Sequence, residues 1–118
     1  MPLPALRSKL VGDGWKTPDT YCNCFSSITN RPAVYLFLLV DRETYDMGMV
    51  AYVGMSKNLL QRLTGHPVFG EIQDTGHWAM RWFKPVDEPD LRPVEAKYIT
   101  QFDPPWNING RPRGVIFS

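Results

Sequence analysis

Apolar residues gather most densely at positions 33–40, where Ala-Val-Tyr-Leu-Phe-Leu-Leu-Val stands between a proline and an aspartate. A short run rich in β-branched and aromatic residues is typical of a fully buried strand. A polar stretch over 41–48 ends in glycine, and a second apolar run follows over 49–54. The two runs predict an antiparallel hairpin. A third strand is expected over 77–83, where apolar and polar residues alternate only loosely.

Two later segments have helical spacing. Ser56 is a candidate N-cap, so we expect a helix over 57–65 that ends at Gly65. A second helix is expected to begin after Asp90 and to end before Pro104. The apolar residues that would turn these two helices toward the sheet are Leu59, Leu60 and Leu63, and Leu91, Val94, Tyr98 and Phe102.

The start of the chain is mixed in character, but Leu3, Leu6 and Leu10 follow a helical spacing. We therefore expect residues 1–31 to form an N-terminal arm or short helix packed on an α/β domain over 32–118. A chain of 118 residues has room for one domain with one hydrophobic core.

Charge adds little to this picture. The net charge of +1 does not indicate a strongly basic nucleic-acid-binding protein. Basic residues are nevertheless concentrated near the two ends of the chain, which allows a local basic face. These residues are Arg7, Lys9, Lys16, Arg111 and Arg113.

The cysteines and the longest apolar run indicate in which cellular compartment the protein is expected. Cys22 and Cys24 are too close for an unstrained disulfide, so reduced, structural thiols are expected. The alternative is half of a zinc site, which His66 and His77 would complete. The first ten residues carry no signal-peptide pattern, and the run at 33–40 is too short to cross a membrane. We expect no membrane attachment and a cytoplasmic location.

Four polar residues fall at positions that a shared site could use. Tyr35 and Tyr52 lie in the two strands of the predicted hairpin, and Arg62 lies on the first helix. Glu95 is expected in the first turn of the second helix, where the helix dipole favours a charged carboxylate. The polar residues four positions before and after the arginine, which share its helix face, are Asn58 and His66.

In this order and spacing, the sequence resembles the GIY-YIG nuclease family. A lone Tyr-Val-Gly carries no weight, but the whole series, with a helix-borne glutamate, is specific. The matching segments are Ala33-Val34-Tyr35, Tyr52-Val53-Gly54, residues 55–63, His66, residues 93–99 with Glu95, and residues 104–107 with Asn107.

The resemblance implies a small α/β domain with a three-stranded antiparallel sheet flanked by helices. It also implies a metal-dependent endonuclease that hydrolyses DNA phosphodiester bonds. Glu95 would hold one Mg²⁺ or Mn²⁺ ion, and Arg62 would bind the phosphate. A tyrosine would activate the attacking water, and Tyr35 is preferred to Tyr52 for that role.

Other residues would have supporting roles under the same resemblance. His66 would assist proton transfer, while Gly54, Asn58 and Asn107 would hold the site in shape. The sequence departs from the family pattern at Ala33, which replaces a glycine, and in a longer hairpin loop. The candidate DNA contacts outside the catalytic set are Lys57, Arg81, Lys84, Arg111 and Arg113.

Taken singly, each of these residues has a simpler explanation. Strand tyrosines are usually core residues, and a helical arginine is usually solvated. The alternative functions are a catalytically silent nucleic-acid-binding module of the same fold, or a protein-binding effector or inhibitor. Because so short a chain leaves little room for a DNA-reading domain, we expect weak sequence specificity, recognition of DNA structure, or help from a homodimer or a targeting partner.

Overall fold

The apolar run at 33–40 forms the central strand of a sheet. In the computed structural model, which describes residues 1–17 and 30–107, this strand is β1 (Ala33–Val40), and all eight of its residues are buried. β2 (Gly48–Ser56) and β3 (Trp78–Pro85) pair with it on either side, both antiparallel. β1 is apolar throughout because both of its edges are paired and both of its faces are covered.

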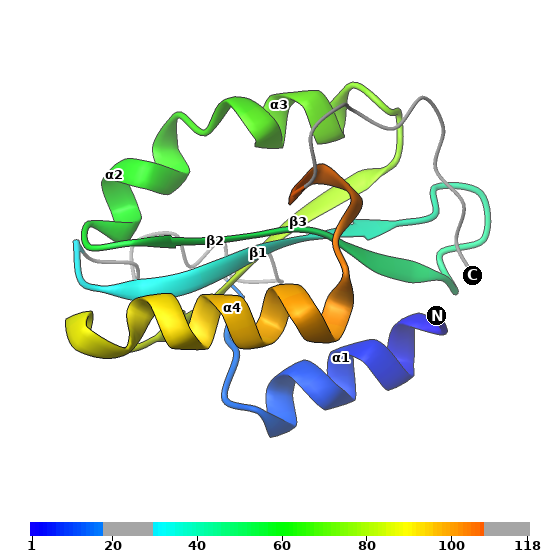
Figure 1. Cartoon of the computed structure of the whole chain (residues 1–118). Helices are drawn as coiled ribbons and strands as arrows, with labels where there is room; N and C mark the ends of the chain where they lie inside the picture. Colours follow the sequence, from blue (N-terminus) through cyan, green and yellow to red (C-terminus); the bar gives the residue numbers. More distant parts are fainter. Residues whose placement is uncertain (18–29, 108–118) are drawn as a thin grey trace.

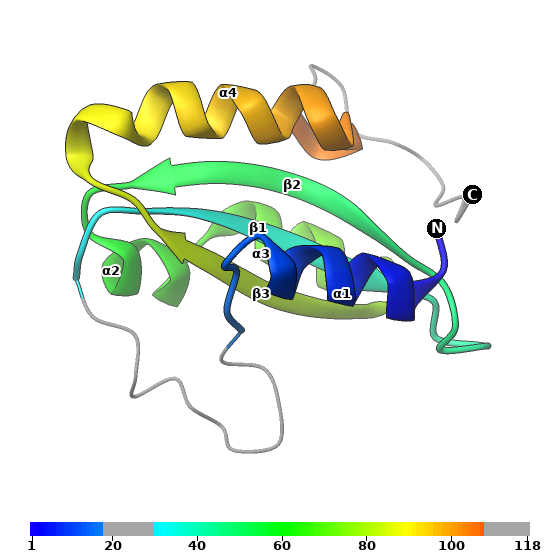
Figure 2. The same ribbon diagram turned by 90° about the horizontal axis from the view of Figure 1, so that it is seen from below.

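Helices cover both faces of this sheet (Figures 1 and 2). α1 (Leu3–Gly12) and α4 (Leu91–Phe102) lie on one face. α2 (Leu59–Thr64) and α3 (Pro67–Gln73) lie on the other. The 3₁₀ turns η2 (Glu88–Asp90) and η3 (Pro105–Asn107) precede and follow α4. The predicted α/β class with a three-stranded antiparallel sheet is therefore confirmed.

The sheet separates two clusters of buried side chains. The predicted apolar stripe of α4 packs in the first cluster, together with buried Leu6, Leu10 and Trp15 from the N-terminal segment. The leucines predicted to face inward from α2 pack in the second cluster. The second cluster also holds the aromatic side chains Tyr35, Phe37, Tyr52, Phe69, Phe83 and Trp106.

One irregularity interrupts the β1–β2 ladder next to Tyr52. Phe37 lies opposite Tyr52, but the next residue, Leu38, lies opposite Val50, which leaves Ala51 as an extra residue in β2. From Gly54 to Tyr52 the alternation is regular, so Tyr52 shares the face of Tyr35 and Phe37. The bulge places Ala51 on this same face, in the cluster beneath α2 and α3.

The predicted helix within 57–65 is confirmed as α2, with Gly65 as its C-cap, but the prediction that Ser56 is its N-cap was wrong. Ser56 is the last residue of β2, and its Oγ accepts a hydrogen bond from the backbone N–H of Asn58 (3.0 Å). α2 begins later because a distant segment satisfies its first N–H groups. These bonds run from Leu59 N to Arg31 O (3.2 Å) and from Gln61 N to Asn30 Oδ1 (2.9 Å).

Some predictions lie outside the described residues, namely those for Cys22, Cys24, Arg111 and Arg113. In the part of the chain that is described, no helix combines the length and hydropathy needed to span a bilayer.

Candidate functional site

Tyr35 lies at the centre of the candidate site. Its side chain is buried and crosses β2 at Gly54, the residue opposite it in the ladder. A Cβ atom at Gly54 would lie 2.5 Å from both Cζ and Oη of Tyr35. The glycine of the Tyr-Val-Gly segment therefore makes room for the phenol ring on this face of the sheet.

Two side chains contact the hydroxyl of Tyr35. His66 Nε2 lies 2.8 Å from Tyr35 Oη, and Arg62 Nε donates to the same oxygen at 3.3 Å. Arg62 comes from α2, and His66 is the N-cap residue of α3. The connection between two short helices thus brings a guanidinium and an imidazole to one phenol.

His66 was expected to share one helix face with Asn58 and Arg62, and this expectation was wrong. It does not continue α2 with Asn58 and Arg62, because α2 ends at Thr64 and Pro67 begins a helix that was not predicted. Proline is favoured at a first helical position, so this residue starts a helix as well as stopping one.

The hydrogen bonds of His66 determine which ring nitrogen is protonated. Its Nδ1 accepts a hydrogen bond from Val68 N (3.2 Å), so that nitrogen carries no proton. Burial, and then the charge of Arg62, lower the pKa of His66 to about 4. The ring is therefore neutral near pH 7, its proton lies on Nε2, and Nε2 donates to Tyr35 Oη.

The contact with Arg62 opposes the effect of burial on the pKa of Tyr35. Burial raises the pKa of the phenol well above its ordinary value, and the nearby Tyr52 raises it further. The hydrogen bond and the charge of Arg62 act in the opposite direction and lower this pKa. Tyr35 raises the pKa of Arg62 in turn, so the guanidinium stays charged.

Tyr52 forms the half-buried side of the same cluster. Its ring centroid lies 6.2 Å from that of Tyr35 and 5.2 Å from that of His66. The ring stacks on Phe37 with an interplanar angle of 22°. The β1–β2 register and the aromatic stack together hold this phenol beside the other three groups.

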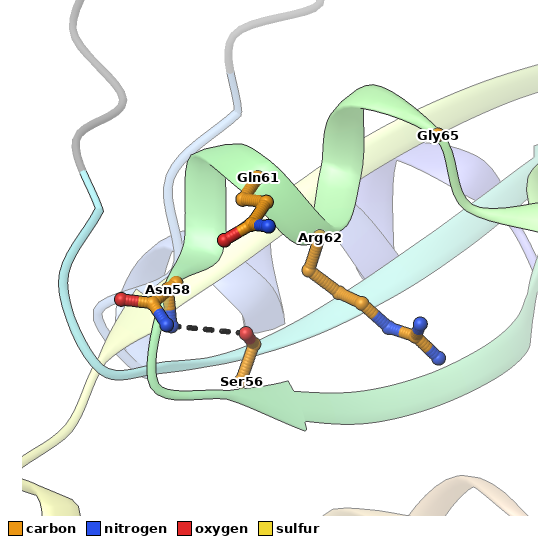
Figure 3. A pocket seen from close by; sticks show the side chains of 5 residues that line it. All are labelled: Ser56, Asn58, Gln61, Arg62 and Gly65. Atoms are coloured by element: carbon orange, nitrogen blue, oxygen red, sulfur yellow. Dashed lines mark hydrogen bonds between the residues drawn. The ribbon is translucent and has the colours of Figure 1, made fainter.

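A shallow pocket of about 260 Å³ adjoins the cluster (Figure 3). All five residues that line it are polar or glycine, and one carries a permanent charge: Ser56, Asn58, Gln61, Arg62 and Gly65. In Figure 3 the Arg62 side chain extends from α2 over β2. A guanidinium among neutral hydrogen-bonding groups is suited to a phosphate. Sequence reasoning missed Gln61, although its spacing from Asn58 was available as a signal.

Glu95 lies apart from these residues. It is in the second turn of α4, so the expected first-turn position was wrong. Its helix covers the face opposite α2, but it packs chiefly on β2, the strand that carries Tyr52. Burial raises the pKa of the half-buried carboxylate, and Arg92 partly offsets this effect. Within the described residues Glu95 makes no hydrogen bond or ion pair, and no contact joins it to the tyrosines.

Asn107 supports the strand that carries Tyr52. Its side-chain Oδ1 accepts from Val53 N (2.8 Å), and its Nδ2 donates to Val53 O (2.7 Å). β2 is an edge strand, and the amide side chain pairs with its outer edge as another strand would.

The basic residues proposed as DNA contacts differ in their surroundings. Lys84 donates to Tyr98 Oη (3.0 Å) and to the carbonyl oxygen of Asp13, so the fold engages its ammonium. Arg81 lies over the ring of Phe69, 5.2 Å from the centroid. Lys57 is exposed and pairs with Glu88 (3.0 Å) beside the β2–α2 turn.

The neutral, buried state of His66 predicts a stability change with pH. In the unfolded chain His66 has its ordinary pKa of 6.5, whereas in the folded chain its pKa is about 4. Between these two pH values the unfolded chain binds a proton at His66 that the folded chain does not, so the free energy of unfolding falls as the pH drops from 6.5 to 4. Between about pH 7 and about pH 4.5 we expect wild type to lose about 2–3 kcal/mol more than His66→Phe. Urea titrations at both pH values measure this, and equal losses would contradict it.

The resemblance to a known family rests on the motif residues alone. No family model, curated protein or solved structure matches this chain. The GIY-YIG resemblance therefore stays a prediction.

Proposed function

We propose that this chain is a metal-dependent endonuclease that hydrolyses DNA phosphodiester bonds, as its GIY-YIG resemblance implies. One observation carries the proposal: Tyr35 Oη lies between two hydrogen-bond donors, His66 Nε2 and Arg62 Nε. Arg62 is exposed and borders the polar pocket. A tyrosine that only fills a core needs one hydrogen-bond partner and no exposed cation.

The chemistry assigned to each group follows from these contacts. The guanidinium of Arg62 binds the phosphate oxygens and stabilises the negative charge that builds on them during attack. Arg62 is the group that lowers the pKa of Tyr35 against the larger, opposite effect of burial, so formation of the phenolate depends on Arg62. Tyr35 is assigned as the group that accepts the proton of the attacking water, as the resemblance implies. Tyr52, on the half-buried side, orients that water.

The residues present are compatible with one hydrated divalent ion. Glu95 is half-buried, and within the described residues its carboxylate forms no ion pair, although the charge of Arg92 acts on it. The same residues contain no group of three or more acidic, histidine or cysteine side chains placed to hold a metal ion together. Glu95 would hold Mg²⁺ as the resemblance implies, and Mg²⁺ commonly keeps most of its waters, so a single protein ligand is compatible with it. The ion would add positive charge at the phosphate.

Nicking of a supercoiled plasmid tests the proposed activity. Purified protein is expected to nick the plasmid with Mg²⁺ or Mn²⁺ and to stop when a chelator is added. Glu95→Gln is expected to lose at least about a hundredfold in rate, since it removes the ion's anionic ligand. The matched control is Glu88→Gln, because Glu88 is an exposed acid paired with Lys57 just before α4.

The rival is a nucleic-acid-binding module that does not cut. No described hydrogen bond or ion pair joins Glu95 to the other four residues, which favours this rival. Equal inertness of wild type and Glu95→Gln, with intact DNA binding in both, would support the binding module and exclude the nuclease. Inertness without DNA binding would favour a protein-binding effector.

A further inference from the structure

Exposed aromatic rings lie at the end of the sheet opposite the Tyr35 cluster, where the β1–β2 and α3–β3 loops meet. Tyr45, in the β1–β2 loop, is 55% exposed, and Trp78, at the start of β3, is 58% exposed. Both line one pocket of about 480 Å³, which we call the Tyr45–Trp78 surface. Its other lining residues are Arg42, Gln73, Gly76, His77 and Ala79. Exposed aromatic rings beside one hollow are typical of binding sites.

Hydrogen bonds join the two loops. The backbone N–H of Arg42 donates to His77 Nδ1 (3.2 Å), and its guanidinium donates to Gly76 O (3.3 Å). Tyr45 N donates to Asp41 O (2.9 Å), and Tyr45 itself has a left-handed backbone with φ +58°. A large aromatic residue is rare in that conformation, so the loop holds this ring outward at a local cost.

The Asp41 side chain organises the same loop. Its Oδ1 accepts from Glu43 N (3.0 Å), and its Oδ2 accepts from Thr44 Oγ1 (3.2 Å). The rings are therefore presented by a preorganised loop, which lowers the entropic cost of binding.

Charge distinguishes this end of the sheet from the other. The loops that carry the Tyr45–Trp78 surface contain one permanent cation, Arg42, and four carboxylates, Asp41, Glu43, Asp46 and Asp74. Asp41 Oδ1 also lies 3.9 Å from His77 Nδ1. The opposite end, with the Tyr35 cluster, carries both four exposed cations, Arg31, Lys57, Arg62 and Arg92, and three exposed carboxylates, Asp87, Glu88 and Asp90. The Tyr45–Trp78 end is therefore the more negative of the two, and a DNA backbone is repelled from it.

We infer that the Tyr45–Trp78 surface binds a basic segment of a partner protein. An arginine or lysine side chain of that segment lies against the exposed rings, and the net negative charge of the two loops complements its charge, although Arg42, whose guanidinium is bonded to Gly76 O, lines the hollow. This inference does not depend on nuclease activity, although such a partner would direct the catalytic end to its substrate.

Indole N–H signals in NMR spectra of the whole chain test the inference. Trp78 is exposed, whereas Trp15, Trp82 and Trp106 are at most 4% exposed and serve as internal references. The probes are a short peptide of alternating glycine and arginine, its glycine–glutamate counterpart, and a short single-stranded oligonucleotide. We expect the arginine peptide to shift the Trp78 signal saturably and the glutamate peptide to leave it unchanged.

Variants separate this site from non-specific attraction. Trp78→Ser and Tyr45→Asn are expected to weaken arginine-peptide binding, measured by fluorescence anisotropy, by at least about fivefold. Asparagine tolerates the left-handed backbone at position 45. Val11→Ser, at another exposed apolar residue, is expected to have no effect.

Three results would overturn the inference. The first is peptide affinity that neither aromatic variant changes. The second is a Trp78 shift caused by the oligonucleotide and not by the arginine peptide, which would assign the surface to nucleic acid. The third is concentration-dependent self-association that Trp78→Ser abolishes, which would assign it to a second copy of the chain.

Discussion

Replacing Arg62 by alanine is expected to reduce the rate of plasmid nicking by about 10²–10³-fold, the usual cost of removing one preorganised group from a developing negative charge. Arg62 is also the cation that opposes the effect of burial on the pKa of Tyr35. Its loss therefore weakens both phosphate binding and formation of the phenolate. Initial nicking rates at saturating Mg²⁺ measure the effect.

A conservative variant and a matched control make this prediction specific. Arg62→Lys keeps the charge but loses the planar fork, so only partial activity is expected. Arg31→Ala removes another exposed cation, one that does not line the polar pocket, and is expected to retain most of the activity. Equal loss in Arg62→Ala and Arg31→Ala would show that total charge, rather than this contact, determines the rate.

Gly54→Ala is expected to lower the free energy of unfolding by about 1–3 kcal/mol, as overpacking of a core does. The added Cβ would meet the rigid ring of Tyr35 at 2.5 Å, and that ring is buried between β2 and the α2–α3 connection. Relief requires Tyr35 to move, so nicking activity should fall as well. Urea titration monitored by circular dichroism gives the stability change.

The chain offers a matched glycine for this test. Gly70 lies within α3, and a Cβ there would have nothing within 4 Å. Gly70→Ala is therefore expected to stabilise the protein by about 0.5–1 kcal/mol through helix propensity. In a Tyr35→Leu background, the cost of Gly54→Ala should shrink, because the clashing ring is absent. An unchanged cost in that background would place the clash elsewhere.

Periodicity alone was sufficient to predict most of the framework. The run at 33–40 fitted a buried strand best, and the leucines at 59, 60 and 63 indicated the packed face of α2. The stripe of α4 and the hairpin followed from the same patterns. These elements were predictable because a buried face imposes a repeat on the sequence.

The geometry of the candidate site was less predictable. Nothing in the sequence marks Ala51 as a bulge residue, yet that bulge places it on the same face as the neighbouring Tyr52. Pro67 indicated the end of a helix, and its role in starting α3 with His66 as the cap depends on tertiary context. The pairing of Asn107 with the β2 edge is likewise a long-range contact without local pattern.

The position of Glu95 relative to the Tyr35 cluster is the central question, and Mn²⁺ measures it directly. A paramagnetic ion broadens the NMR signals of nearby protons. If Glu95 holds an ion at the cluster, Mn²⁺ should broaden the ring signals of Tyr52 and His66 in wild type, and Glu95→Gln should abolish this broadening. Broadening confined to α4, or unchanged in Glu95→Gln, would contradict the proposed nuclease site.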